Sequence, residues 1–291
     1  MVLEIVAETG EEFVDFSPYV ASINDDGVVH FQAETRDGKR GVYRWDGFVS
    51  AILEDARACS HPDANEVGDV CFYSDDGLVL IREGRAEILA RPVGPLGPTI
   101  AGDFIGYRAN DSVYLWREGY CLEVAQGHSG LQGLPVVNRL GDLVYRSQNG
   151  IYLSRGSSLV PVIELGGSVT SLGNFPFLND SGEVSFVTDG FGAVWREGQV
   201  NVVLEVGNRF ESLRGLLYQG PDAWIYYATP VGGELTIFSS DSQPVLAIGQ
   251  ELEGARISEF ALNPVSINLR AEVVLRVGLD DSRQLIILCR K

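Results

Sequence analysis

The sequence predicts an all-β protein, a seven-bladed β-propeller with four short strands in each blade. Three observations support this prediction: a polar turn that contains glycine, an alternating apolar run directly after it, and the return of this pair about every 40 residues. Glycine tolerates the positive φ that such turns require, and the alternating run is typical of a β-strand. A period of this length with four strands per repeat indicates a propeller.

The repeats account for the whole chain, which we therefore interpret as a single domain of residues 1–291. The turn glycine, or the residue in its place, recurs seven times, at Gly27, Gly68, Gly102, Gly141, Gly182, Asp222 and Ala271. Successive positions are 41, 34, 39, 41, 40 and 49 residues apart. Asparagine begins the turn at positions such as Asn24, Asn65, Asn138 and Asn179.

Strands can be located within each repeat from these turns. In the first repeat we expect strands at 18–23, 28–33, 41–45 and 48–53, and in the fifth at 175–178, 184–188, 193–196 and 200–206. The sixth repeat is degenerate, with expected strands at 223–227 and 235–238. Short glycine-containing hairpins such as Arg196-Glu197-Gly198 join the third and fourth strands. We expect no helix of ordinary length.

The two ends of the chain complete one blade. After Ala271 the sequence supplies strands at 273–277 and 284–289 and then stops one strand short of a full repeat. The chain begins with an additional strand that resembles the outer strands of other repeats. We therefore predict that residues 2–7 complete the C-terminal blade and close the ring. Closure removes sheet edges that would otherwise pair with other chains.

The turn and the strand after it resemble a family of bacterial tandem-repeat proteins with the pattern Asn-x-x-Gly-x-x-Ala-Phe. The chain reads Asn-Asp-Ser-Gly-Glu-Val-Ser-Phe at 179–186, and the family's Gly-Ile-Tyr-like continuation is present at 41–43 and 150–152. The alanine position instead holds the residues His30, Cys71, Val144 and Ser185. The resemblance covers essentially the whole chain and implies propeller architecture, without implying a particular activity.

Members of that family are often exported, whereas the N-terminus here carries no basic segment followed by an apolar core. We expect a cytoplasmic protein as written, or an exported one if a leader has been removed. The four cysteines, Cys59, Cys71, Cys121 and Cys289, fit no zinc-binding spacing. We interpret them as buried or semi-buried thiols in a reducing compartment, with one disulfide as the alternative.

The charge balance excludes two classes of partner. Acidic residues exceed basic ones by 40 to 22, which gives a net charge of −18. Such a surface repels nucleic acid and anionic membranes, because it has no excess of lysine or arginine to neutralise phosphates. No apolar run reaches the roughly 18 residues of a membrane helix. We therefore expect no nucleic-acid or membrane partner, and a monomer.

Two repeated features have structural explanations. Asp-rich turns such as residues 24–27 and 74–77 lack the ligand spacing of a calcium loop, so we interpret them as turns and expect no metal or cofactor. Trp45, Trp116 and Trp195 occupy equivalent positions. We expect them to pack one blade against the next, with sugar-stacking platforms as the alternative.

The longest loops join the outer strand of one blade to the inner strand of the next, which favours that rim as a binding surface. They contain His61 and His128, which we consider as catalytic candidates because imidazole can act as a general base near neutral pH. We interpret both, however, as exposed loop residues, so that their substitution should leave folding intact. The candidate ligand-binding residues are Arg57, Asp63, Arg209, Glu211 and Arg256; the same loops also contain Arg91, Arg214 and Glu253.

The sequence contains no Gly-x-Ser-x-Gly elbow and no glycine-rich phosphate loop before a helix. We therefore favour a non-enzymatic binding module or scaffold that holds a protein or small-molecule ligand at the propeller rim and channel mouth. The first alternative is a lyase or hydrolase with one site around His61 and His128. The second is a carbohydrate-binding lectin, which the divergence of the rim loops disfavours.

Overall fold

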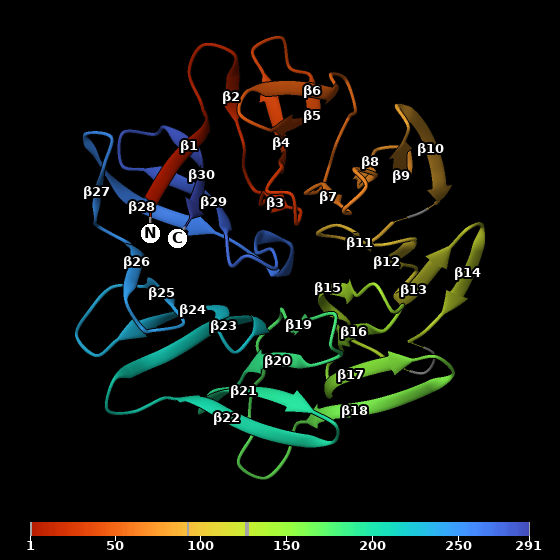
Figure 1. Cartoon of the computed structure of the whole chain (residues 1–291), viewed down its shortest axis with the longest axis vertical. Coiled ribbons are helices and arrows are strands. Elements are labelled where there is room, and N and C mark those ends of the chain that lie inside the picture. The colour runs from red at the N-terminus through yellow and green to blue at the C-terminus, as the bar shows by residue number, and fades with distance from the viewer. Residues whose placement is uncertain (1, 92, 126–127, 291) are drawn as a thin grey trace.

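Seven antiparallel sheets form a closed ring in the computed structural model, which describes residues 2–91, 93–125 and 128–290 (Figure 1). The predicted fold class, an all-β seven-bladed propeller with four-stranded blades, is confirmed. In the described part of the chain, the single helical element is the short 3-10 helix η1 (Pro264–Ser266). No helix among the described residues is long and apolar enough to cross a membrane.

Blades 2 to 4 each contain four strands that follow one another in the sheet in chain order. Blade 2 consists of β7 (Asp63–Ala64), β8 (Val70–Ser74), β9 (Gly77–Arg82) and β10 (Arg85–Ala90). Blade 3 consists of β11 (Thr99–Ala101), β12 (Phe104–Ala109), β13 (Ser112–Arg117) and β14 (Tyr120–Glu123). Blade 4 consists of β15 (Gln132–Val137), β16 (Leu143–Arg146), β17 (Gly150–Arg155) and β18 (Ser158–Glu164).

Blades 5 and 6 have the same order, and the sixth is less degenerate in structure than in sequence. Blade 5 consists of β19 (Phe177–Leu178), β20 (Val184–Val187), β21 (Phe191–Arg196) and β22 (Gln199–Glu205). Blade 6 consists of β23 (Phe210–Gly220), β24 (Ala223–Pro230), β25 (Thr236–Ser239) and β26 (Pro244–Ala247). The strand β23 is 11 residues long, whereas the inner strand β19 of blade 5 has two.

Blades 1 and 7 each contain an additional short strand. Blade 1 consists of β2 (Phe13–Asp15), β3 (Ser22–Ile23), β4 (Val29–Thr35), β5 (Arg40–Trp45) and β6 (Val49–Leu53). Its inner edge is split between β2 and β3, both paired with β4, so the expected continuous strand at 18–23 is shorter than predicted. Blade 7 consists of β27 (Glu251–Leu252), β28 (Ala255–Ala261), β29 (Val273–Leu279), β30 (Gln284–Arg290) and β1 (Val2–Glu8).

The N-terminal strand closes the ring. β1 pairs antiparallel with β30, from Val2 opposite Arg290 to Glu8 opposite Leu285, and the two chain ends lie next to each other in Figure 1. An ion pair between Arg290 and Glu4, with 3.0 Å between the Nη1 and Oε2 atoms, spans the same two strands. The first and last segments of the sequence therefore stabilise one blade together.

The core lies between the blades, because each sheet buries both of its faces. In β29, Leu275 packs among residues of blade 6 such as Ile225, while its neighbour Val274 points to the other side and packs with Phe31 of blade 1. Alternation along a strand thus supplies two apolar surfaces. Trp45, Trp116 and Trp195 are only 7%, 9% and 4% exposed, so these three rings pack between blades and present no sugar-stacking platform.

The four cysteines are all free. Cys71 and Cys289 are buried and Cys59 is half-buried, but Cys121 is exposed, which corrects the expectation for that residue. Cys121 lies on the outer strand β14, whose residues face solvent, because the last strand of a blade has no neighbour on its far edge. None of the four thiols forms a disulfide, so that alternative is wrong.

In five of the seven blades one asparagine side chain stabilises the polar turn and also joins it to the next blade. The Oδ1 atom of Asn138 accepts hydrogen bonds from the backbone N–H groups of Leu140 (3.1 Å) and Asp142 (3.0 Å). Its Nδ2 group donates to the carbonyl oxygen of Asn179 in blade 5, at 3.0 Å. Asn24, Asn65, Asn179 and Asn268 form the same contacts, with donor–acceptor distances to the next blade of 3.3, 2.9, 3.3 and 3.0 Å.

Two other side chains complete these contacts where the asparagine is missing. Thr99 of blade 3 donates through Oγ1 to the carbonyl of Pro135 in blade 4 (3.0 Å), and Gln219 of blade 6 donates to the carbonyl of Ile267 in blade 7 (3.4 Å). Seven side chains therefore link seven blades in a closed series, which we call the asparagine belt. The face of the ring that carries these turns is called the turn face, and the opposite face the loop face.

The repeated arginine of the hairpins supports the same turns. Arg82 and Arg155 each donate from Nε to the aspartate of their own blade's turn, Asp69 and Asp142, at 2.8 Å. In blade 5, Arg196 pairs with Glu183 in the same way. The arginine follows its acidic partner by 13 residues in each case, and the contact holds the third strand against the turn.

The centre of the ring is filled by two segments that leave the regular strands. The helix η1 places Val265, which is 8% exposed, in the apolar cluster of blades 4 and 5, and Val20 from the segment between β2 and β3 packs against the same cluster. Ser266 joins the two segments by donating to the carbonyl of Ala21 at 3.0 Å. In Figure 1 the chain before β29 extends to the middle of the ring. These two segments therefore narrow the axial channel.

We expect Asn138→Ala to lower the free energy of unfolding by about 2–4 kcal/mol, because it removes three hydrogen bonds and leaves buried backbone groups without partners. Urea denaturation followed by fluorescence measures the change. The control is Asn208→Ala, an exposed loop asparagine, for which the expected change is within about 0.5 kcal/mol. Equal losses in the two variants would contradict a stabilising role for the belt.

Candidate functional site

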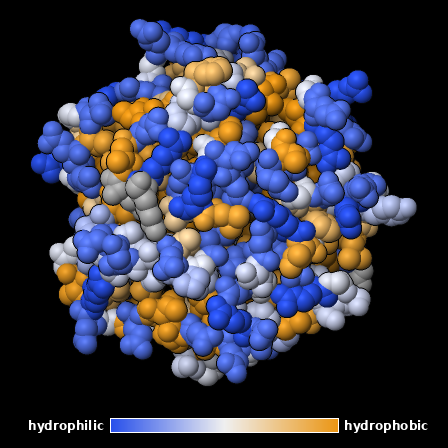
Figure 2. Space-filling model, in the orientation of Figure 1, coloured by the Kyte–Doolittle hydropathy of each residue, from blue (hydrophilic) through white to orange (hydrophobic). Residues whose placement is uncertain are grey.

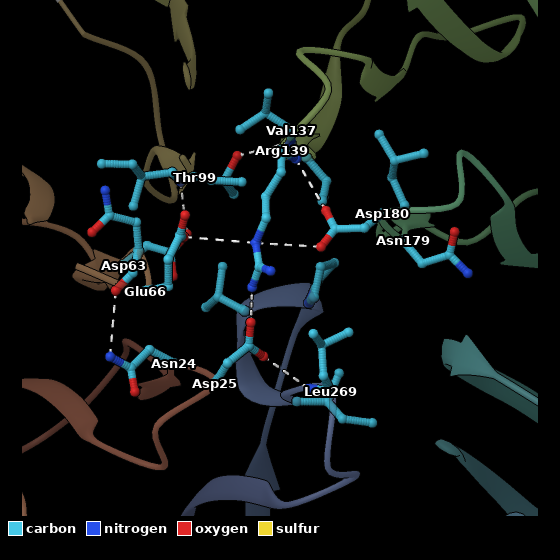
Figure 3. A pocket seen from close by; sticks show the side chains of 18 of the residues that line it. Asn24, Asp25, Asp63, Glu66, Thr99, Val137, Arg139, Asn179, Asp180 and Leu269 are labelled. Carbon is cyan, nitrogen blue, oxygen red and sulfur yellow. Dashed lines mark hydrogen bonds and ion pairs between the residues drawn. The ribbon is translucent and has the colours of Figure 1, made fainter. Parts of the chain in front are cut away.

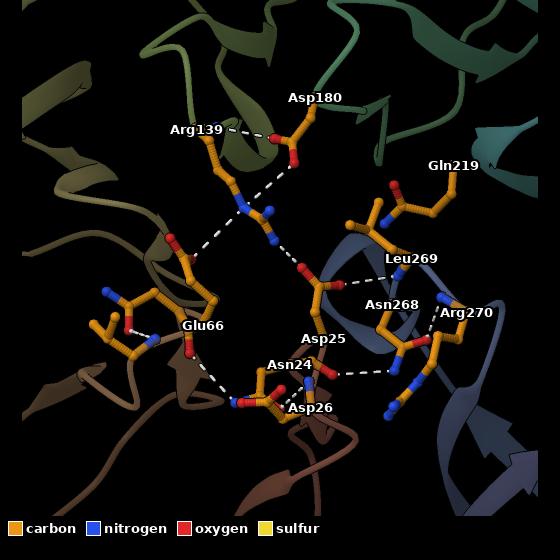
Figure 4. A network of polar contacts seen from close by, with 12 residues as sticks. Asn24, Asp25, Asp26, Glu66, Arg139, Asp180, Gln219, Asn268, Leu269 and Arg270 are labelled. Atoms are coloured by element: carbon orange, nitrogen blue, oxygen red, sulfur yellow. Dashed lines mark hydrogen bonds and ion pairs between the residues drawn. The ribbon is translucent and has the colours of Figure 1, made fainter.

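The axis is closed at the turn face by one arginine. Arg139, in the turn of blade 4, extends between carboxylates of three other blades (Figure 3). It forms an ion pair with Asp25, and its Nε atom lies 3.4 Å from Asp180 and 3.7 Å from Glu66. Figure 4 shows that Asp25 also accepts a hydrogen bond from the backbone N–H of Leu269 in blade 7, at 3.0 Å. These contacts join five blades across the axis.

A small cavity of about 110 Å³ lies beneath Arg139. It is lined by Asp63, a predicted ligand-binding residue, which is 7% exposed. The Oδ2 atom of Asp63 accepts a hydrogen bond from the N–H of Ile100 in blade 3 (2.8 Å), and Oδ1 accepts one from Ala64 (3.0 Å). Burial raises the pKa of this carboxyl to about 7. The cavity is smaller than the roughly 300 Å³ typical of small-molecule sites. We therefore interpret Asp63 as a structural residue that links blades 2 and 3 through its hydrogen bond to Ile100.

A larger hollow of about 700 Å³ lies on the loop face between blades 5, 6 and 7, and we call it the blade 5–7 pocket. Its volume falls in the range of ligand-binding pockets, roughly 300–1,000 Å³. The walls come from the loop before β19, the end of β20, the inner strands β23 and β28, and two residues of blade 6. The lining consists of residues 171–175, 187–189, 212–214 and 260–262 with Tyr227 and Leu235.

Aromatic side chains from all three blades line this pocket. Phe175, Tyr227 and Phe260 are each half-buried, so their rings keep some accessible surface. The Tyr227 ring lies over Gly215, where an added Cβ atom would come within 2.1 Å of it, so glycine is needed at that position. Burial raises the pKa of Tyr227 to about 12, although the nearby Arg214 acts in the opposite direction. The phenol, like that of an unperturbed tyrosine, is neutral at physiological pH and can donate a hydrogen bond.

Two charged side chains also line the pocket. Arg214 is exposed on β23, and in the described part of the chain its guanidinium forms neither an ion pair nor a hydrogen bond. Asp189 follows β20 in blade 5, and the Thr170 hydroxyl that donates to it lowers the pKa of this carboxyl. The pocket therefore combines apolar rings with a positive group on blade 6 and a negative group on blade 5. It contains no histidine or cysteine.

His61 is buried, which corrects the prediction of an exposed loop residue. It is 2% exposed, and its Nε2 atom lies 3.2 Å from the carbonyl oxygen of Pro98 on the next blade's loop. A Cβ atom on Gly97 would approach the ring to 2.5 Å, so the loop around Gly97 covers the imidazole. Burial lowers the pKa of His61 to about 4. Its contacts are those of a structural residue between blades 2 and 3.

His128 has different neighbours. Its Nδ1 atom lies 2.8 Å from the hydroxyl of Tyr145, and its ring centre is 4.2 Å from that of Tyr152, both in blade 4. The two imidazoles therefore contact different blades, and the structure does not bring them together. Among the described residues, no group of three or more histidine, cysteine, aspartate or glutamate side chains is arranged to hold a metal ion.

The other predicted ligand-binding residues are exposed outside the blade 5–7 pocket. Arg57 forms an ion pair with Asp76. The Cζ atom of Arg209 lies 5.0 Å from the centre of the Phe210 ring. Glu211 accepts a hydrogen bond from the backbone of Gly232 at 3.1 Å, and Arg256 has its backbone N–H bonded to Asp280 at 3.0 Å. The structure does not bring these four together with Asp63.

Sequence reasoning placed Arg214 among the rim residues but missed the aromatic walls. Tyr227 lies within a strand of blade 6 and Phe260 at the end of an inner strand, where apolar residues are expected in the core. The available signal was the degenerate sixth repeat, because a departure from the repeat marks the blade where packing differs. Figure 2 shows one face of the ring, where hydrophilic side chains predominate and hydrophobic ones are interspersed.

The sequence matches none of the protein-family models and none of the curated proteins with which it was compared. Similar solved structures include a chain of the mitotic checkpoint complex (14% identity, TM-score 0.58), which the alignment covers over 91% of its length and 100% of this chain. A structure of YCF48 bound to D1 peptide is 10% identical, with a TM-score of 0.56 and coverage of 98% of this chain and 96% of that one.

A third similar structure is the extracellular domain of BT4673 from B. thetaiotaomicron, at 14% identity and a TM-score of 0.56. The alignment covers 95% of this chain but only 39% of the BT4673 domain. At these identities the comparisons show the propeller fold alone. They define this chain as a β-propeller whose neighbours include proteins solved in complex with other proteins or peptides.

Asp63→Asn should remove a component of the pH dependence of stability. A carboxyl with a pKa near 3.9 in the unfolded chain and about 7 in the folded protein keeps its proton only in the folded state between these values. Stability contributed by Asp63 is therefore lost as pH rises from about 4 to 7, by up to about 1.4 kcal/mol per pH unit. Urea denaturation across this range measures the difference between wild type and variant.

The buried His30 and His61, whose pKa values are lowered to about 4, give the opposite slope in both proteins, so the difference isolates Asp63. Asp55→Asn, at an exposed loop position, serves as the control. A difference between wild type and Asp63→Asn that stays constant with pH would contradict the raised pKa.

We expect His61→Ala to lower the free energy of unfolding by about 2–4 kcal/mol, because it creates a cavity and leaves the Pro98 carbonyl without a partner. His128→Ala should cost less, since that ring is only half-buried. Chemical denaturation of the two variants provides the comparison. Equal and small losses of stability in the two variants would contradict a structural role for His61.

Proposed function

We propose that this protein is a non-enzymatic binding module that holds an extended segment of a partner protein in the blade 5–7 pocket. The observation that carries the proposal is a pocket of about 700 Å³ with half-buried aromatic rings from three blades. Accessible aromatic surface next to polar groups is typical of protein recognition sites, because it supplies apolar contact area at little entropic cost.

The other function classes receive less support from this pocket. A lectin of repeated sites needs equivalent pockets, but this one is formed by different residue types from three blades. A hydrolase or lyase around His61 and His128 needs both imidazoles at one site, but His61 is buried against Pro98 and His128 lies against Tyr145 of blade 4. The comparisons favour a protein ligand, since one neighbour was solved with a peptide and another in a protein complex.

A cytoplasmic location accompanies this proposal. The four cysteines are free, which is usual for proteins kept in a reducing compartment. Cys121 is exposed on an outer strand, where it would be open to oxidation outside such a compartment.

Ser171→Trp should block the pocket without disturbing the core, because Ser171 is an exposed residue of its wall. The control is Ser181→Trp, an exposed position in a turn of blade 5 on the opposite face. Purified protein is panned against displayed random linear peptides. We expect enriched peptides to lose at least tenfold in affinity on Ser171→Trp and to keep their affinity on Ser181→Trp. Peptides that bind Ser171→Trp as well as wild type, or no enrichment at all, would overturn the proposal.

A further inference from the structure

Arg214 differs from most arginines of this protein. The chain has 40 acidic and 22 basic residues, and many arginines have carboxylate partners. The arginines in ion pairs are Arg40, Arg44, Arg57, Arg82, Arg139, Arg155, Arg196, Arg270, Arg276, Arg283 and Arg290. Arg214 lines a pocket and, within the described residues, has no ion-pair or hydrogen-bond partner. Its donors are therefore free to meet a ligand from outside.

The surroundings of Arg214 define the chemistry of that ligand. Tyr227 packs behind it over Gly215 and carries a neutral hydroxyl, so blade 6 presents a guanidinium and a phenol to the same pocket. Phe175 and Phe260 supply apolar walls from the neighbouring blades. A guanidinium binds carboxylates through two parallel hydrogen bonds. The rings beside it favour an aromatic or aliphatic group.

The negative charge of Asp189 in the same pocket determines which wall can bind the ligand's carboxylate. Asp189 lies on blade 5 and is held in its ionised form by Thr170. It repels an anion at its own position, which leaves the blade 6 wall as the favourable place for a carboxylate. With a net charge of −18, the rest of the protein repels acidic segments, so recognition of a carboxylate depends on this local cation.

We propose that the blade 5–7 pocket recognises a carboxylate adjacent to an aromatic or aliphatic side chain, with Arg214 as the carboxylate receptor. The inference rests on the proposed function and specifies the partner segment. The carboxylate is either an acidic side chain or the C-terminal carboxylate of the segment, since both present the same two oxygens.

The test uses synthetic peptide arrays in which a fixed phenylalanine is followed by Asp or Asn and flanked by random residues. A second pair of arrays carries the phenylalanine at a C-terminus that is a free acid or an amide. We expect wild type to bind either the Asp array at least tenfold more strongly than the Asn array, or the free-acid array at least tenfold more strongly than the C-terminal amide array. The pair that shows the preference identifies the source of the carboxylate. Arg214→Gln should abolish the preference while keeping binding to the amide array.

Arg91→Gln is the matched control, because Arg91 is also an exposed arginine of the loop face without an ion pair in the described chain. It should keep the full preference. Equal binding of acid and amide arrays by wild type, with both lost on Ser171→Trp, would overturn carboxylate recognition and leave the proposed function standing. Failure of every array to bind wild type better than Ser171→Trp would overturn both.

Discussion

The architecture of this protein depends on a side-chain amide that makes hydrogen bonds both within its blade and to the next blade. In five of the seven turns an asparagine oxygen accepts from two backbone N–H groups of its own turn, as Asn138 does with Leu140 and Asp142. Its nitrogen donates to a carbonyl of the next blade. Buried backbone groups require partners, and here a single side chain supplies them within the blade and between blades. Formation of the turn and alignment of neighbouring blades are therefore coupled.

The contacts along the axis limit where a ligand can bind. Val265 and Val20 occupy the middle of the ring, and Arg139 closes the turn face with carboxylates from three other blades. Polar contacts thus cross one end of the axis, and apolar contacts narrow the interior to a cavity of about 110 Å³. This cavity is smaller than a typical small-molecule site, so a ligand of ordinary size needs space elsewhere. The blade 5–7 pocket on the loop face satisfies that requirement, next to the segment that leads into η1.

The pocket forms where the repeat departs from its pattern. Blade 6 lacks the turn asparagine and uses Gln219 instead, and its inner strand β23 is extended to 11 residues. Gly215 in this strand makes room for the Tyr227 ring, and the preceding residue Arg214 is left without an ionic partner in the described chain. Repeats that follow the consensus bury their side chains between blades. The divergent blade retains accessible aromatic and charged groups.

The sequence by itself determined the blade count, the positions of most strands and the closure of the ring by residues 2–7, because these features follow from local signals. A turn glycine and an alternating run specify a turn and a strand through contacts between near neighbours, and their repetition specifies the ring. Even Ala271 adopts the left-handed conformation, with φ of 57°, that its alignment with the turn glycines required.

The tertiary structure alone decided the environment of the loop residues. His61 is buried because the loop around Gly97, 36 positions further along the chain, folds over its ring, and Asp63 becomes a buried carboxyl because Ile100 of the next blade covers it. The blade 5–7 pocket likewise combines residues from 171 to 262. Contacts between distant segments have no periodic signature in the sequence, so burial and the grouping of side chains emerge only when the blades pack together.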